Sequence, residues 1–141
     1  MSCPRLHFYL PAYTQMLAHA AAMVPTEACG LLAGQGEHVS RVFPLPNVAP
    51  DPRLGFIGDR SATIAALRTI DRERLSWLAT YHSHPPGEPA VPSPADRRGA
   101  AGHPGVLQVI VSLSTEDGPT VRAYSLAGGQ FTEVDVLTIS E

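Results

Sequence analysis

Two histidines and one aspartate are the residues of this chain whose types and spacing could do chemistry. His82 and His84 flank Ser83 at the end of an apolar run, and Asp96 follows a proline-rich segment. Side chains two residues apart on an extended strand project from the same face, so the two imidazoles can converge. A carboxylate returned by a loop can supply a third ligand and leave a fourth position open. That is the arrangement of a catalytic zinc site, whereas a structural site is closed by four ligands.

The segments that must position these residues alternate between strand and helix. The hydrophobic spacing and the glycine and proline punctuation predict an extended start over 6–10, a helix over 11–24, strands over 29–34 and 38–43, a helix over 61–75, a strand over 77–84, a helix from about 93 to 101, a strand over 106–113 and a hairpin of strands over 121–126 and 131–137. This interleaving, with a nearly continuous apolar run at 106–113, predicts an α/β sandwich.

Several side chains are expected to face the core or to end an element. The first helix is predicted to bury Tyr13, Leu17, Ala20 and Val24, and the second to bury Ile64, Leu67 and Ile70. Ser61 is the expected N-cap of the second helix, and Gly128-Gly129 the expected hairpin turn.

Composition limits the class of protein. A chain of 141 residues, 44% hydrophobic and 16% charged, fits a single globular domain over 1–141. The net charge of −3 and the lack of a basic cluster argue against nucleic-acid binding. Cys3 and Cys29 make no disulfide framework, and we find neither a signal peptide nor a membrane-length apolar run. We therefore expect a cytoplasmic protein that spans no membrane.

Two stretches carry a family resemblance. The segments 81–85 (YHSHP) and 92–96 (PSPAD) resemble the H-x-H-P … S-x-x-D signature of the JAMM (MPN+) metalloproteases. The upstream segment 25–32 (PTEACGLL) is similar to the second hallmark of that family, a glutamate before a small-residue strand. The order of elements also matches over essentially the whole chain. The resemblance implies a three-layer α/β/α sandwich with a mixed sheet, related in fold to the cytidine deaminases.

The family roles transfer to this sequence one residue at a time. The resemblance implies that His82, His84 and Asp96 are zinc ligands, that Glu27 is the general acid/base and that Ser93 lies beside the catalytic water. Compact prokaryotic members look most similar, in particular those that act on ubiquitin-like sulfur-carrier proteins. The resemblance thus implies hydrolysis of the amide bond after the C-terminal Gly-Gly of such a β-grasp protein.

The loops around these residues show one departure from the family pattern. Eight residues separate His84 from Ser93, where the family signature has seven, and an extra residue in such a loop costs little. The segment 44–60 is a second long loop. In relatives the corresponding region grips the substrate tail, for which Asn47, Asp51, Arg53 and Phe56 are candidates here; the alternative is a disordered surface loop.

Simpler interpretations stand beside the chemical ones. Glu27 could be an ordinary surface glutamate, and Cys29 a small buried residue rather than a reactive thiol. The segment 93–96 is also a good helix start, with serine as N-cap and an acid three residues later, and this is compatible with metal binding. The remaining histidines have no spaced partners and are expected to be surface or structural: His7, His19, His38 and His103.

Other functions also fit part of the sequence. A metal-free scaffold of the MPN− branch would have the same fold, but that branch typically lacks the ligands, which are all present here. A general metallopeptidase acting on small peptides would use the same site. A deaminase requires H-x-E followed by P-C-x-x-C, and this chain has neither. The sequence fixes neither the identity of the substrate nor the oligomeric state.

Overall fold

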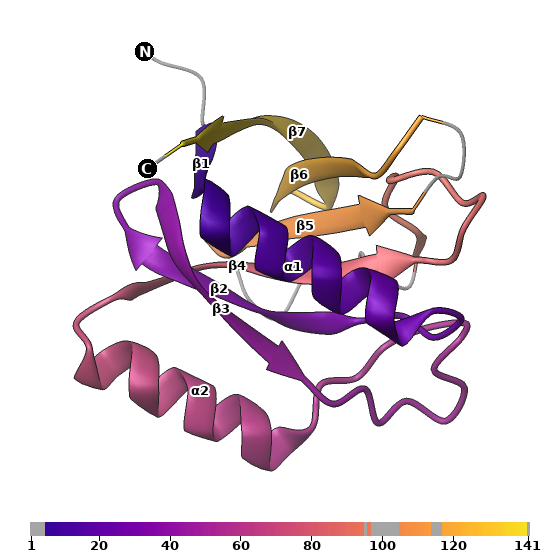
Figure 1. Cartoon of the computed structure of the whole chain (residues 1–141), viewed down its shortest axis with the longest axis horizontal. Coiled ribbons are helices and arrows are strands. Elements are labelled where there is room, and N and C mark those ends of the chain that lie inside the picture. Colours follow the sequence, from indigo (N-terminus) through magenta and orange to yellow (C-terminus); the bar gives the residue numbers. More distant parts are fainter. Residues whose placement is uncertain (1–4, 95, 97–104, 114–116, 141) are drawn as a thin grey trace.

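A computed structural model describes residues 5–94, 96, 105–113 and 117–140 of the chain. Two helices are set among seven strands along these residues, as Figure 1 shows. The elements are β1 (Arg5–Tyr9), α1 (Leu10–Met23), β2 (Cys29–Gln35), β3 (His38–Leu45), α2 (Arg60–Arg72), β4 (Ser76–His84), β5 (Leu107–Ser112), β6 (Thr120–Ala127) and β7 (Gln130–Ile139). None of the helices in the described segments combines the length and the apolar character needed to cross a membrane.

The strands form one mixed sheet in the order β1-β3-β2-β4-β5-β6-β7. Strand β1 runs parallel to β3 and to β7, and β4 runs parallel to β5, while the other neighbours are antiparallel. The expected α/β class with a mixed sheet is confirmed. The pairing of β1 with β7 also closes the sheet on itself, which the sequence pattern did not predict.

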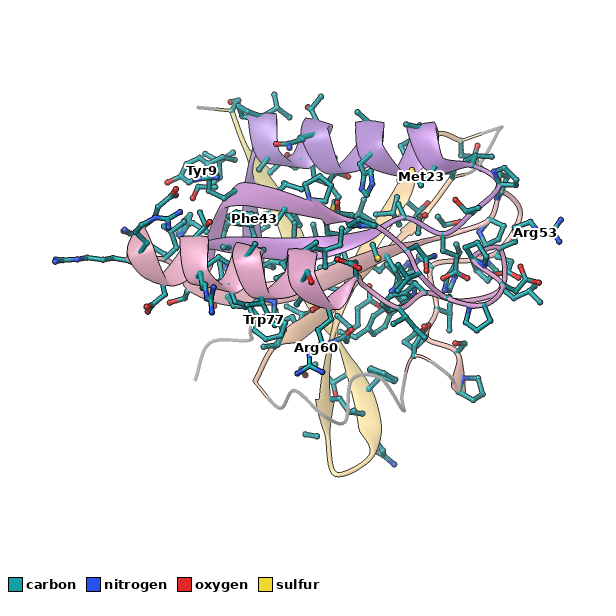
Figure 2. All side chains as sticks on the ribbon, turned by 90° about the horizontal axis from the view of Figure 1, so that it is seen from below. Tyr9, Met23, Phe43, Arg53, Arg60 and Trp77 are labelled. Atoms are coloured by element: carbon teal, nitrogen blue, oxygen red, sulfur yellow. The ribbon has the colours of Figure 1, made fainter. Side chains whose placement is uncertain are left out.

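The two helices cover opposite faces of the sheet (Figures 1 and 2). On β2, Leu32 packs in one apolar cluster with Met16 of α1, whereas Leu31 packs in another cluster with Ile70 of α2. Adjacent strand residues point to opposite faces, so α1 and α2 lie on the two sides of β2. Every residue of β2 from Cys29 to Gly34 is buried as a result.

Both helices differ in detail from the sequence prediction. In α1 the fully buried residues are Ala12, Met16 and Ala20, and the expected Tyr13 and Leu17 are partly buried against the same core. Val24, expected inside, is 44% exposed beyond the helix end. In α2 the N-cap is Asp59, whose side chain accepts from the Ala62 backbone N–H at 2.9 Å.

Within α2, Ser61 is therefore a residue of the first turn and not the cap. Ile70 is buried as expected, whereas Ile64 is 40% exposed. The hairpin turn between β6 and β7 is confirmed: Gly128 and Gly129 both adopt positive φ angles, of 59° and 77°, which glycine adopts at no steric cost.

The end of the β2–β4 ladder positions Glu27 relative to the two histidines. Cys29 pairs with His82 in the antiparallel register. One step further, the Ser83 backbone N–H donates to the Ala28 carbonyl at 2.9 Å, and the Ala28 N–H donates to the Ser83 hydroxyl oxygen at 2.8 Å. These bonds fasten Glu27, the residue before Ala28, beside the two histidines.

Gly30 allows β2 to lie close to its neighbours. A Cβ atom at Gly30 would lie 2.4 Å from Cε1 of Tyr81 and 2.6 Å from the Phe43 carbonyl oxygen. Tyr81 is fully buried and the carbonyl belongs to the β3 backbone, so neither group can move away without disturbing the packing around it.

We therefore expect Gly30→Ala to lower the free energy of unfolding by about 1–3 kcal/mol, the usual cost of overpacking a core. Chemical denaturation of the two proteins measures it. Gly55→Ala is the matched control, because a Cβ there meets no atom within 4 Å. Equal stability of the Gly30 variant and the parent would contradict this account of the β2 packing.

Candidate metal centre

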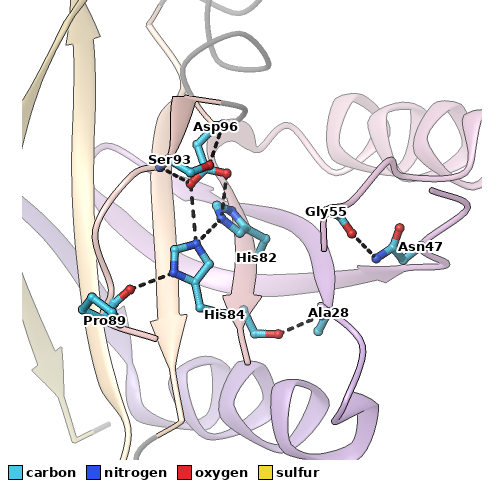
Figure 3. Close-up of polar contacts among 9 residues, drawn as sticks. Ala28, Asn47, Gly55, His82, His84, Pro89, Ser93 and Asp96 are labelled. Carbon is cyan, nitrogen blue, oxygen red and sulfur yellow. Dashed lines mark hydrogen bonds and ion pairs between the residues drawn. The ribbon is translucent and has the colours of Figure 1, made fainter. Parts of the chain in front are cut away.

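Three expected ligands lie together at the end of β4. The Nε2 atoms of His82 and His84 are 3.3 Å apart, and the Asp96 carboxylate lies 3.1 Å from the first and 3.5 Å from the second (Figure 3). All three residues are buried. Within the part of the chain that the structure describes, they are the one group of three or more such side chains close enough to hold a metal ion.

The donor set fits a metal. The Nδ1 atom of His84 lies 2.7 Å from the Pro89 carbonyl oxygen, which can only accept. This bond places the proton of a neutral ring on Nδ1, so the Nε2 lone pair faces His82 and Asp96, as in metal-bound histidines. Two imidazole nitrogens and one carboxylate oxygen are ligands that zinc accepts.

Ser93 and Asp96 hold each other in place. The Ser93 backbone N–H donates to Asp96 Oδ2 at 2.8 Å, and the Asp96 N–H donates to Ser93 Oγ at 3.1 Å. This reciprocal pair is a capping box with aspartate as the acid. The helix start expected at Ser93 is therefore present, and the remainder of the helix predicted to about residue 101 lies outside the described residues.

The charge state of Asp96 follows from its contacts. Burial works to raise the pKa of this carboxyl, but His82, His84 and the Ser93 N–H outweigh burial and hold the pKa below its usual range. Asp96 therefore carries a negative charge in the buried site, which suits a ligand for a cation.

The loop between His84 and Ser93 is held through three successive carbonyl groups. The carbonyl oxygens of residues 88, 89 and 90 accept hydrogen bonds in turn from the side chains of Ser112, His84 and Tyr124. These three donors come from β5, β4 and β6. The eight-residue loop is thus bonded to three strands. Tyr124 and Ser112 have this role although no sequence motif pointed to them.

Glu27 lies in the same cleft and is buried, not on the surface. Its backbone N–H donates to the Pro52 carbonyl at 2.7 Å, and its carbonyl accepts from Asn47 Nδ2 at 2.8 Å. Burial raises the pKa of the Glu27 carboxyl to about 7, although the attraction of His84 works in the opposite direction. A carboxyl with this pKa can both take up and release a proton near neutral pH.

The 44–60 segment has a defined hydrogen-bonded structure. The Asn47 Nδ2 atom donates to the Glu27 carbonyl and, at 3.0 Å, to the Gly55 carbonyl. The Asn47 Oδ1 atom accepts from the Ala49 and Ile57 backbone N–H groups. One amide therefore shapes the loop and joins it to Glu27. Asp51 and Arg53, two other candidates of this loop, form an ion pair with each other at its exposed surface.

A cleft of about 540 Å³ runs from these residues along the sheet. Polar side chains line one end: Glu27, His84, Ser93 and Asp96. Apolar side chains of the 44–60 segment, α2 and β4 line the remainder: Leu54, Phe56, Leu67 and Trp77. The cleft is thus long and largely apolar, with the candidate ligands at one end, as ligand sites commonly are.

Cys29 is the buried thiol that the simpler interpretation expects. Burial raises its pKa to about 11, and its Sγ lies 3.7 Å from the Leu45 carbonyl oxygen. A thiol with this pKa has little reactive thiolate at neutral pH.

Three of the other histidines are structural, one of the two roles expected for them, and have partners distant in sequence. His19 contacts the Tyr81 hydroxyl at 2.7 Å, and the rings of His7 and His38 stack with centroids 4.7 Å apart. These pairs join elements distant in sequence, which spacing cannot reveal. His103 lies outside the described residues.

Comparisons with known proteins place the chain in a family. Residues 10–127 match the model of prokaryotic homologs of the JAB domain. A probable TtuB-protein conjugate cleaving protease of Thermus thermophilus is 44% identical over 85% of this chain and 75% of its own. The desampylase of Haloferax volcanii is 34% identical over 96% and 98% of the two chains. A CysO-cysteine peptidase of Mycobacterium tuberculosis is 30% identical over 89% and 86%.

Solved structures agree on the fold. A protein from Desulfitobacterium hafniense superposes with a TM-score of 0.85 at 31% identity, over 96% of this chain and 94% of that one. A JAB1/MPN domain protein from Archaeoglobus fulgidus superposes with a TM-score of 0.59 at 20% identity, over 94% and 99%. The chain therefore belongs to the prokaryotic JAB family and is a peptidase of the JAMM type.

Proposed function

We propose that this chain is a zinc-dependent isopeptidase that hydrolyses the amide bond after the C-terminal Gly-Gly of a ubiquitin-like or sulfur-carrier protein. The observation that carries the proposal is the convergence of His82, His84 and Asp96 beside a buried Glu27 at one end of a long cleft. The names of the relatives, which refer to protein conjugates and to a CysO-cysteine bond, support this substrate class.

In this proposal His82, His84 and Asp96 hold the zinc. When bound, zinc supplies a Lewis acid that polarises the scissile carbonyl and lowers the pKa of a water to about 7. Glu27 takes the proton of the attacking water and returns a proton to the leaving amine, for which its raised pKa is suited. Ser93 Oγ accepts from the Asp96 N–H, so its own hydroxyl hydrogen is available to donate to the developing oxyanion.

The cleft supports an extended substrate. Its apolar part is lined by side chains of the 44–60 segment and α2, and it leads to the candidate ligands. An extended tail ending in two glycines could lie in this cleft with its last carbonyl at the metal end. Glycines would present no side chain to the lining residues Glu27, Ser93 and the candidate ligands.

The metal-free scaffold is the weaker alternative, because the ligand donors and the bond from His84 to Pro89 are all in place. A peptidase for small peptides shares the same site, so only a comparison of substrates separates it from the proposal.

Glu27→Gln tests the acid/base role. We expect the variant to retain zinc, because Glu27 is not among the ligands, and to lose turnover by about 10²- to 10⁴-fold, the usual contribution of general acid–base catalysis. Metal analysis and cleavage of a Gly-Gly-tailed fusion measure the two effects. Glu37→Gln, at an exposed position, is the control. Full activity of the Glu27 variant would refute the assignment.

Metal removal tests the zinc requirement and the substrate class together. We expect near-stoichiometric zinc in the purified protein, loss of cleavage on chelation and recovery on adding zinc. The Gly-Gly-tailed fusion should be cleaved and a generic fluorogenic peptide should not. Protein that contains no zinc would favour the scaffold, and equal rates on both substrates would favour the small-peptide peptidase.

A further inference from the structure

The two candidate histidine ligands differ in what holds each imidazole ring in place. Metal-binding imidazoles usually donate their second ring nitrogen to a carbonyl or carboxylate, which fixes the ring. His84 follows this rule, since its Nδ1 bonds the Pro89 carbonyl. In His82 the Nδ1 atom is buried and has no hydrogen-bond partner among the described residues. Another contact must therefore hold the fully buried ring of His82.

That contact is an aromatic ring from the 44–60 segment. The rings of Phe56 and His82 are stacked, with centroids 4.3 Å apart and an interplanar angle of 19°. Phe56 is half-buried and also packs against the apolar cluster beneath α2. A ring lying flat on an imidazole resists tilting of that imidazole, which would open a gap between the two faces.

Phe56 is itself held on both sides. The carbonyl of Gly55 accepts from Asn47 Nδ2, and the N–H of Ile57 donates to Asn47 Oδ1. The same Nδ2 atom donates to the Glu27 carbonyl. One asparagine amide therefore sets the position of the stacking ring and of the backbone that carries Glu27; Figure 3 draws its bond to Gly55 beside the ligands.

We propose that Phe56 is a positioning residue for the metal. Its ring holds the His82 imidazole with Nε2 directed at His84 and Asp96, and replaces the hydrogen bond that His82 lacks. This inference rests on the zinc binding in the proposed function. It gives the 44–60 segment a role in metal affinity, separate from any role in gripping substrate.

The test compares zinc affinity in variants that keep or lose the ring, measured by competition with a chromophoric chelator and no substrate. Phe56→Leu keeps an apolar side chain and should weaken zinc binding roughly three- to tenfold, the range that corresponds to one aromatic stacking contact. Phe56→Tyr keeps the ring face and should bind within about twofold of the parent.

A control separates positioning from packing. Phe43 packs against the same apolar cluster but is not among the residues that line the cleft, so Phe43→Leu should leave zinc affinity unchanged. Thermal unfolding of the metal-free proteins then shows whether the two leucine variants lose similar stability.

Unchanged affinity in Phe56→Leu, or equal loss in Phe56→Tyr and Phe56→Leu, would overturn the inference and leave Phe56 a packing residue. A parent protein that binds no zinc would instead overturn the proposed function, and this inference with it.

Discussion

Burial of two imidazoles and a carboxylate at one point is the constraint on which the rest of the site depends. Such groups cost free energy when removed from water unless each is matched by a partner. His84 has the Pro89 carbonyl, Asp96 has the Ser93 N–H, and the three side chains have each other. A bound cation would neutralise the carboxylate and occupy the ring lone pairs that face it.

The fold meets this constraint by bringing three segments to one end of the sheet. Strand β4 supplies the histidines, the segment before β2 supplies Glu27, and the loop after β4 returns Asp96. Hydrogen bonds between side chains and backbone join these segments to their neighbours. The Ser83 hydroxyl accepts from the Ala28 N–H, and Asn47 Nδ2 donates to the Glu27 carbonyl. One partner in each of these bonds is a backbone group, whose position is fixed by the fold.

The sequence predicted the parts of this arrangement that local spacing determines. Two histidines one residue apart on a strand, and an acid three residues after a capping serine, are patterns that physical periodicity explains. It missed the parts that depend on long-range packing. Which residues of α1 are buried depends on its packing against the sheet. Helix α2 begins at Arg60, one residue before Ser61, which makes Asp59 the N-cap.

The residues that support the site were also beyond sequence reasoning. Asn47, Ser112 and Tyr124 act through bonds to residues of other segments, up to 34 positions away in the case of Tyr124. No local pattern marks such a contact. Phe56 was among the loop candidates, but as a contact for substrate; its stacking on His82 follows only from the fold.

The pairing of β1 with β7 has a consequence for how the protein forms. The pairing joins residues 5–9 to residues 135–139, which are far apart in the sequence. Contacts of such separation are slow to form, because the entropy of closing the chain must be spent before they contribute. Strand β3 can therefore pair with β1 early in synthesis, whereas the other edge of β1 has no partner strand until β7 has been made.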